Sequence, residues 1–199
     1  MRNLILGAMV AAGMALVGGT GPAHACKTGK AADEMTLEDA KKAYECIGDK
    51  LHAGYMKGKK YWIPADVVKD YRNWELVSTA PAAPGWHGER FLVTYVNAKG
   101  ADEYMQFKEE GASLPAGSVL VKESFIVNGK GKASVGPLFI MQKAAAGKSP
   151  KTGDWYYMMV APNGAPQGVN VFQACDACHA GFEDQDRLGY PVEEARASR

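Results

Sequence analysis

The sequence has few cysteines and few histidines, four of each in 199 residues, and no excess of charge of either sign. Its 23 Lys and Arg stand against 22 Asp and Glu, so the formal net charge at pH 7 is only +1. This balance argues against a nucleic acid partner, because phosphate neutralisation needs clustered excess base. After residue 25, no apolar run approaches the roughly 20 residues that a membrane-spanning helix needs. The composition leaves a globular chain of one domain, or one domain with an appended element.

Residues 1–25 have the features of a secretory signal peptide. Arg2 supplies a positive start, residues 4–17 form an apolar stretch, and Ala23-His24-Ala25 has the small-x-small pattern of a cleavage site. Glycines and a proline within residues 18–22 end the apolar stretch too early for a membrane span. We therefore expect removal of residues 1–25 and a mature chain that works in the periplasm.

The four cysteines form two groups in the mature chain. Cys175 and Cys178 belong to one short motif, which leaves Cys26 and Cys46 as a disulfide pair in an oxidising compartment. The alternative is a lipidated N-terminal cysteine at Cys26. A lipobox usually has Leu where this chain has Ala23, and lipidation would leave Cys46 unpaired.

Hydrophobic periodicity predicts an α+β fold, a mainly antiparallel β-sheet with an N-terminal helix and a short C-terminal helix. Apolar residues at spacings of three and four predict a helix from Thr36 to about Met56, with Asp39 completing a capping box. We assign this helix to an N-terminal extension, residues 26–60, ahead of a main domain at residues 61–199. β-rich runs predict strands, and turn residues 97–100 follow the second of them. The predicted strands are 74–78, 91–96, 118–127, 135–142 and 155–160, and the last helix spans 174–182.

The motif Cys175-Asp176-Ala177-Cys178-His179 has the spacing of a covalent haem attachment site. On one helical turn, the two thiols can add to the vinyl groups of a haem, and His179 can bind the iron as its proximal ligand. The alternatives are a thiol redox pair and a zinc site. A thioredoxin-like pair sits early in a βαβ unit, whereas only 21 residues follow Cys178. A structural zinc site needs four ligands, and the other cysteines form no second close pair. We predict one covalent haem c.

The sequence offers few candidates for a second axial ligand. No Met follows His179, so a distal thioether could come only from upstream residues such as Met105, Met141, Met158 or Met159. The mature chain has two other histidines, His52 on the predicted first helix and His87 in a loop. The simplest prediction is a five-coordinate iron with an open distal face. Such an iron favours small-ligand binding or chemistry over simple electron transfer.

A haem motif near the C-terminal end of a β-rich exported chain resembles the cytochrome P460 family. Three further patterns agree with this resemblance: Tyr71-Arg72-Asn73-Trp74, Gly117-Ser118-Val119-Leu120-Val121-Lys122-Glu123 and Gly153-Asp154-Trp155-Tyr156-Tyr157. The resemblance covers roughly Val67 to Pro191. It implies a mono-haem protein built around an antiparallel sheet and, because members are often dimeric, a homodimer.

The resemblance also implies roles for two residues. Some family members oxidise hydroxylamine to nitric oxide or nitrous oxide, and in these a sheet lysine is bonded covalently to the porphyrin. The matching position is Lys122. Arg90 resembles a family arginine that donates hydrogen bonds to a bound nitrogenous ligand or pairs with a haem propionate. The acidic residue that the hydroxylamine-oxidising members use for proton transfer has no assigned match here.

The residues around Lys122 allow a second interpretation. Lys122 interrupts an apolar run, and by itself it is typical of a lysine on a solvated face or at a sheet edge. Strand alternation places Glu123 on the opposite face. Beside a haem, burial would lower the pKa of Lys122 and favour the neutral amine that a cross-link requires. Residues 155–157 could form one wall of the haem site or belong to an ordinary core.

Three functions fit these predictions. The first is an oxidoreductase that acts on hydroxylamine or nitric oxide and passes electrons to a periplasmic redox partner. The second, implied by resemblance to the related cytochrome c′-beta proteins, is a protein that binds a diatomic gas, nitric oxide or carbon monoxide, without turnover. The third is an electron-transfer cytochrome with Met or Lys at the distal position.

Overall fold

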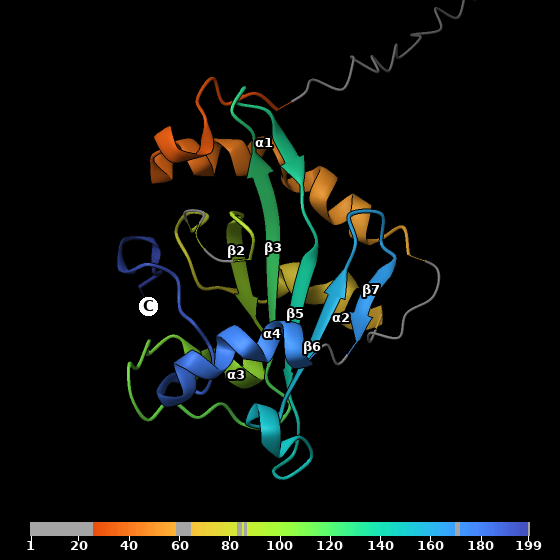
Figure 1. Ribbon diagram of the computed structural model, residues 1–199, viewed down its shortest axis with the longest axis vertical. Helices are drawn as coiled ribbons and strands as arrows, with labels where there is room; N and C mark the ends of the chain where they lie inside the picture. Colours follow the sequence, from red (N-terminus) through yellow and green to blue (C-terminus); the bar gives the residue numbers. More distant parts are fainter. Residues whose placement is uncertain (1–25, 59–64, 83–84, 86, 170–171, 199) are drawn as a thin grey trace, which may run out of the picture.

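The computed structural model describes residues 26–58, 65–82, 85, 87–169 and 172–198. The expected signal peptide and the boundary between residues 60 and 61 lie outside the described residues. Within the described ranges, an antiparallel sheet carries helices on both faces (Figure 1), so the predicted α+β class is confirmed. The helices are α1 Leu37–Tyr55, α2 Ala65–Asp70, α3 Ala98–Tyr104 and α4 Phe172–His179.

The sheet has seven strands among the described residues, and every pairing is antiparallel. They are β1 Glu75–Leu76, β2 Phe91–Val96, β3 Val119–Val127, β4 Ala133–Val135, β5 Leu138–Lys143, β6 Trp155–Val160 and β7 Pro166–Val169. The order across the sheet is β1-β2-β3-β5-β6-β7, and β4 pairs with the C-terminal end of β3. Most neighbours are therefore consecutive in the chain, as hairpin connections allow.

The strand predicted at residues 135–142 is divided between β4 and β5. Gly136-Pro137 separates the two, since proline has no N–H to donate to a ladder. The Gly136 N–H donates instead to the Ser124 carbonyl at 2.8 Å, and the Ser124 hydroxyl donates to the Pro137 carbonyl at 2.5 Å. A Cβ at Gly136 would overlap the Ser124 hydroxyl and lie 3.2 Å from Arg90 Nε. This break therefore places the backbone of Gly136 directly against two side chains.

Three other predicted boundaries are wrong. The strand expected at 74–78 is reduced to the two residues of β1. The turn expected at 97–100 instead opens α3, because the Asn97 side chain accepts the Gly100 N–H at 3.3 Å and caps the helix. The last helix ends at His179 rather than at Phe182. The backbone angles of Phe182, φ −114° and ψ 34°, are not helical. β7 is not among the predicted strands, because Pro166 and Gly168 have the composition of a turn.

Helix α1 packs across one face of the sheet (Figure 1). Its predicted capping box is present: the Thr36 hydroxyl accepts from the Asp39 N–H at 3.2 Å, and the Asp39 carboxylate accepts from the Thr36 N–H at 3.0 Å. Cys26 and Cys46 form a disulfide with their Cα atoms 5.8 Å apart, which ties the preceding segment to α1. The core on this face includes Ile47, Leu51 and Tyr55 of α1 and Phe91, Val93, Val121 and Phe125 of the sheet. Burying each large apolar side chain contributes about 1.5–3 kcal/mol.

A buried carboxylate joins the helices to this face of the sheet. Glu123 of β3 has 0% exposure and accepts hydrogen bonds from Tyr44 Oη at 2.6 Å, Arg72 Nε at 2.7 Å and the Tyr71 hydroxyl. Tyr44 belongs to α1, while Tyr71 and Arg72 belong to a 3₁₀ turn after α2. Arg72 also donates to the Gly48 carbonyl of α1 at 2.6 Å. The predicted orientation of Glu123, away from the face of Lys122, is confirmed.

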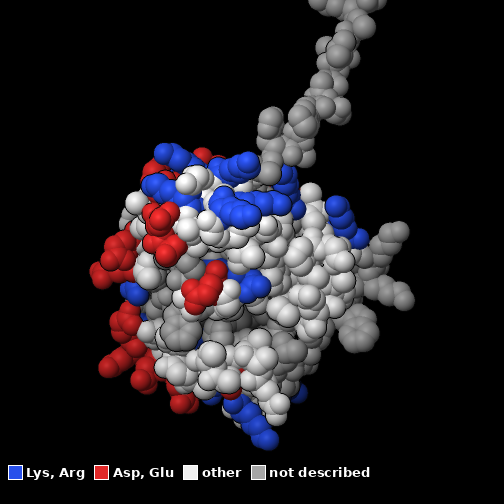
Figure 2. Space-filling view, turned by 45° about the horizontal axis from the view of Figure 1, so that its top comes forward, with Lys and Arg blue, Asp and Glu red and all other residues white. Residues whose placement is uncertain are grey.

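Helix α4 lies on the opposite face of the sheet, near one end of β6 (Figure 1). A second core cluster fills this end and includes Val96, Tyr104, Leu120, Trp155 and Leu188. Figure 2 shows acidic side chains along one side of the molecule and a broad area without charged side chains beside it. No helix in the described ranges is long and apolar enough to span a membrane.

We expect Arg72→Ala to destabilise the protein by about 3–5 kcal/mol, because it leaves the buried Glu123 carboxylate without its cation. The measurement is the free energy of unfolding in urea. Lys42→Ala is the control, since it removes an exposed ion pair with Glu38 and should leave the unfolding midpoint unchanged. Equal losses in the two variants would contradict the importance of the buried pair.

Candidate functional site

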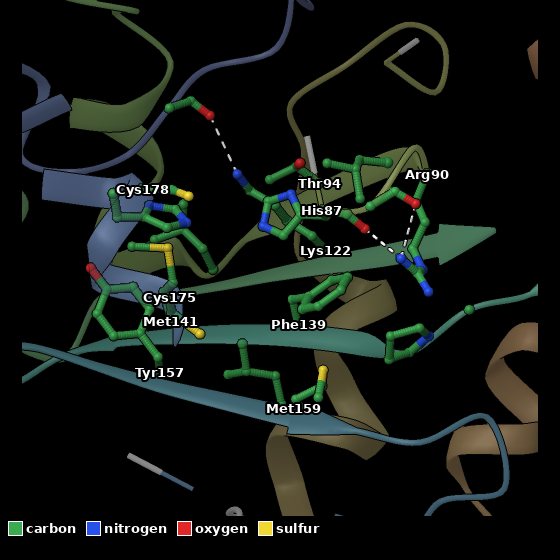
Figure 3. Close-up of a pocket in the computed structure, with 18 of the residues that line it drawn as sticks. His87, Arg90, Thr94, Lys122, Phe139, Met141, Tyr157, Met159, Cys175 and Cys178 are labelled. Carbon is green, nitrogen blue, oxygen red and sulfur yellow. Dashed lines mark hydrogen bonds between the residues drawn. The ribbon is translucent and has the colours of Figure 1, made fainter. Parts of the chain in front are cut away.

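A cavity of about 840 Å³ lies on the sheet face opposite α1 (Figure 3). The sheet, α4, the turn at residues 87–90 and the segment at 189–192 enclose it. Its volume falls in the upper part of the range of roughly 300–1,000 Å³ that is typical of ligand and cofactor pockets. No Asp or Glu is among the described residues that line it. The cavity therefore suits a large, mainly apolar group.

Strand register builds the sheet wall of this cavity. Lys122 of β3 is paired with Thr94 of β2 and with Phe139 of β5, and Phe139 is paired in turn with Met159 of β6. Because paired residues point to the same face, these four side chains form one row along the cavity. A second row includes Met141 and Tyr157.

His179 closes the α4 side with an imidazole of defined tautomer. It is 8% exposed, and its Nδ1 lies 2.6 Å from the Arg187 carbonyl oxygen. A carbonyl only accepts, so Nδ1 carries the hydrogen and Nε2 keeps a free lone pair, as in a metal-binding histidine. Burial, reinforced by the charge of Lys122, lowers the pKa of His179 to about 4. The ring is thus neutral, the form that binds a metal.

Arg187 contacts two residues of the cysteine–histidine motif, Asp176 and His179. Its carbonyl accepts from His179, and its guanidinium donates to Asp176 Oδ1 at 2.5 Å. The Tyr157 hydroxyl donates to the same carboxylate oxygen at 3.1 Å. Asp186 and Arg187 have φ of 55° and 64°, a left-handed turn that presents the Arg187 carbonyl to the ring. The orientation of His179 is therefore fixed by neighbours outside α4.

Both cysteines of the motif line the cavity as free thiols. Cys175 is half-buried, and burial, together with the charges of Asp176 and Cys178, raises its pKa. A thiol redox pair needs the opposite, a lowered pKa that yields a thiolate nucleophile. The described part of the chain has no group of three or more His, Cys, Asp or Glu side chains placed to hold a metal ion. The geometry favours the haem interpretation over both alternatives.

Lys122 is buried in the same cavity. It is 6% exposed, and its Nζ lies 3.4 Å from the Leu188 carbonyl and 3.3 Å from the Gly189 carbonyl. It forms no ion pair with the described carboxylates. Burial lowers its pKa to about 8, so a large neutral fraction exists in mildly alkaline solution. The alternative interpretation, a lysine on a solvated face, is wrong.

Arg90 also lines the cavity, but much of its guanidinium is engaged locally. Nη1 donates to the carbonyls of His87 at 2.5 Å and Gly88 at 3.1 Å (Figure 3). Nε is buried and has no partner among the described residues. Arg90 therefore holds the turn before β2, and its buried Nε–H is available to a ligand.

The remaining sequence candidates divide between the cavity and the core. Met141, Met158 and Met159 line the cavity, whereas Met105 does not. Of the aromatic residues 155–157, only Tyr157 lines it. Trp155 is fully buried in the second core cluster, where its indole N–H donates to the Asp186 carbonyl at 2.8 Å.

His87 is the cavity residue that sequence reasoning left outside the site. Its ring centroid lies 4.6 Å from that of Phe139 and 6.0 Å from that of His179. Burial, together with the charges of Lys122, His179 and Arg90, lowers its pKa to about 3. Its rarity was the available signal, since the mature sequence has only two histidines besides His179. Nothing in the local pattern indicates that the loop folds inward.

These residues fit a haem. The cavity has the size and apolar walls, the two thiols lie on one turn of α4, and the free Nε2 of His179 is available to an iron. The model of a protein family described as Cytochrome P460 matches residues 68–188, which include the motif, Lys122, Arg90 and His87. Helix α1 lies outside the matched range. No curated protein matches the sequence.

We expect Arg187→Lys to raise the reduction potential of the haem. The substitution keeps the charge but loses the planar guanidinium that pairs with Asp176, so the carbonyl holds the His179 N–H less firmly. A less basic imidazole stabilises ferric iron less. A redox titration measures the potential, and Lys42→Arg, at an exposed ion pair with Glu38 on α1, serves as the control. An unchanged potential in Arg187→Lys would contradict this role.

Proposed function

This chain belongs to the cytochrome P460 family and so binds haem, and from that premise we propose that its haem is a single, covalently attached haem c. Cys175 and Cys178 form the two thioethers, and His179 is the proximal ligand. The raised pKa of Cys175 is compatible with this role, because thioether formation consumes the thiols once and needs no stable thiolate.

We further propose that the protein is a haem oxidoreductase that acts on hydroxylamine or nitric oxide. The observation that carries this proposal is the burial of Lys122, with a lowered pKa and no carboxylate partner, in the cavity of the haem motif. A buried lysine without a counter-ion is costly, and it is expected only where it has a task. A bond from its neutral amine to the porphyrin edge would remove that cost; the bond replaces one N–H and one porphyrin C–H, and a two-electron oxidant such as a peroxide takes up the two hydrogens.

The haem iron supplies a site for a small nitrogenous ligand and a route for its electrons. The chain's own residues set the conditions around it. Phe139, Met141 and Met159 give the sheet side of the cavity an apolar surface. Arg90 presents one unpartnered N–H to a ligand or a propionate. The Arg187 carbonyl orients the imidazole of His179, and burial together with the charge of Lys122 keeps it neutral.

A second candidate function is the capture of nitric oxide or carbon monoxide without turnover. The observation in its favour is the absence of Asp and Glu from the described cavity lining. Oxidation of hydroxylamine releases protons, and a carboxylate is the common acceptor. Electron transfer through a distal Met is a third candidate, because Met141 and Met159 line the cavity.

We also propose that the protein works in the periplasm after removal of residues 1–25 and delivers electrons to a redox partner there. The disulfide between Cys26 and Cys46 supports an oxidising compartment. With Cys26 in that bond, the disulfide supports the signal-peptide interpretation over a lipid anchor at the same cysteine. A homodimer, which the family resemblance implies, is part of this proposal and can be tested by light scattering.

Intact-mass spectrometry of the exported protein tests the cofactor. We expect the mass of a chain that begins at Cys26, with one haem bound through two thioethers, two hydrogens lost to the disulfide and two more lost to the bond between Lys122 and the porphyrin. Cys178→Ala should retain at most one thioether and release haem on denaturation more readily. A wild-type mass without haem would overturn the proposal.

Lys122→Met tests the oxidoreductase. In the wild type, peptide mapping should recover the segment around Lys122 linked to the haem peptide, and hydroxylamine should reduce an added electron acceptor. The variant should lose the linked peptide and lower turnover by about 10- to 100-fold, the usual effect of losing a partner of a metal centre. Lys99→Ala, at an exposed position of α3, is the matched control. If the wild type binds nitric oxide but never turns over hydroxylamine, the gas-binding function is the correct one.

A further inference from the structure

His87 lies inside the cavity, facing the proximal histidine. Its ring packs on Phe139 with centroids 4.6 Å apart (Figure 3). Its centroid is 6.0 Å from that of His179. Its Nδ1 is buried and has no hydrogen-bond partner among the described residues. A buried imidazole nitrogen without a partner is costly, so this geometry indicates a group that is still to bind there.

The distance between the two rings decides what that group is. When two imidazoles bind one metal from opposite sides, two metal–nitrogen bonds of about 2.0–2.1 Å plus the two ring radii of about 1.15 Å separate the centroids by about 6.3–6.5 Å. The observed 6.0 Å is within about 0.5 Å of this arrangement, so a small movement of the His87 ring completes it. The 59° angle between the ring planes is compatible with it, because the rings need to share only the metal–nitrogen axis. A small ligand between an iron and His87 would require a wider gap.

We propose that His87 is the sixth ligand of the haem iron in the resting protein, and that a small nitrogenous ligand displaces it. This proposal rests on the proposed function in one respect, the presence of haem in this cavity. It replaces a permanently open distal face with one that opens on ligand binding. In the exchange the imidazole leaves with its electron pair and the incoming donor takes its position, so the oxidation state of the iron does not change.

The backbone around His87 supports a displaceable ligand. His87, Gly88 and Glu89 are three successive residues with positive φ, of 56°, 71° and 56°. Two of them are not glycine, so the turn holds strain that a movement of His87 can release. Arg90 closes this turn by donating to the carbonyls of His87 and Gly88. Among the described residues, no hydrogen bond to Nδ1 holds the ring in the cavity.

Such a ligand makes the iron selective. An incoming molecule must compete with an imidazole that is already in place. Water competes poorly, whereas nitric oxide, or another nitrogen donor at sufficient concentration, can displace the ring. Because His87 must leave first, every ligand binds more weakly than it would bind to an open iron. Its affinity for the open iron is multiplied by the fraction of protein in which His87 is off the iron.

Spectroscopy of the ferric haem protein tests the assignment directly. We expect a low-spin, six-coordinate iron whose near-infrared magnetic circular dichroism has the signature of two imidazole ligands, without the charge-transfer band of a thioether. This wild-type measurement needs no variant to fold. A high-spin five-coordinate iron, or a low-spin iron with Met or Lys as sixth ligand, overturns the proposal.

Substitution of the ring gives an independent test. His87→Phe keeps an aromatic ring against Phe139 and should convert the iron to high spin. His52→Gln removes the other imidazole, which lies on α1 beside Tyr71, and should leave the spin state unchanged. Met141→Leu and Met159→Leu should leave it unchanged as well. Retention of the low-spin state in His87→Phe overturns the assignment.

Azide binding to the ferric protein measures the displacement. In the wild type the observed rate should reach a plateau at high azide, set by dissociation of His87, whereas in His87→Phe it should rise linearly with azide. The apparent Kd should fall by about 10- to 100-fold in the variant, as a ligand-free state populated at about 1–10% requires. Equal rates and affinities in the two proteins overturn displaceable ligation. Failure of both proteins to react with hydroxylamine and nitric oxide would reject the proposed function while leaving the spin-state result intact.

Discussion

The buried carboxylate of Glu123 is the interaction on which the arrangement of this molecule depends. It lies on the face of β3 that α1 covers, and it accepts hydrogen bonds from a guanidinium N–H of Arg72 and from the hydroxyl groups of Tyr44 and Tyr71. These donors come from α1 and from the turn after α2, so a single side chain joins three segments. A desolvated charge tolerates no loss of partners, which makes the spatial relation between helices and sheet specific as well as stable.

The same residue determines where the cavity lies. Side chains alternate along a strand, so anchoring Glu123 to the helices turns Lys122 toward the opposite face. The lysine side chain then enters the cavity, where its Nζ lies near two backbone carbonyls of the described residues. On the α4 side of the cavity, Arg187 orients His179. Its carbonyl lies beside the imidazole, and its guanidinium pairs with Asp176. The positions of both functional side chains thus depend on residues distant from them in the sequence.

Sequence patterns with a local cause were predictable. The α1 capping box, the strand at 91–96 and the attachment motif depend on residues close together in the chain, and the structure contains each helix and strand implied. The division of the strand at 135–142 was harder, because it depends on Ser124 of another strand receiving the Gly136 N–H. The inward position of His87 was not predictable from the sequence either. Its inward position follows from contacts with Arg90 and Phe139, which no periodicity encodes.

Lys122 shows the limit most clearly. Its local pattern favours a solvated lysine, and only the family resemblance placed it near a haem. The burial that reverses the local interpretation comes from residues 188 and 189, far away in sequence. Charge within an apolar run is ambiguous until the opposite wall is known, since the energetic cost of the charge depends on whether water reaches it.

The break at Gly136 also limits how this sequence can diverge. Any Cβ there would overlap the Ser124 hydroxyl, lie 2.9 Å from the Ser124 carbonyl and crowd Arg90 Nε at 3.2 Å. A substitution at position 136 therefore requires substitutions at positions 124 and 90. Among related chains, we expect the three to vary as a set, and a chain that has lost the glycine should also have lost the serine and the arginine. Such covariation would mark the relatives in which this corner of the cavity has been rebuilt.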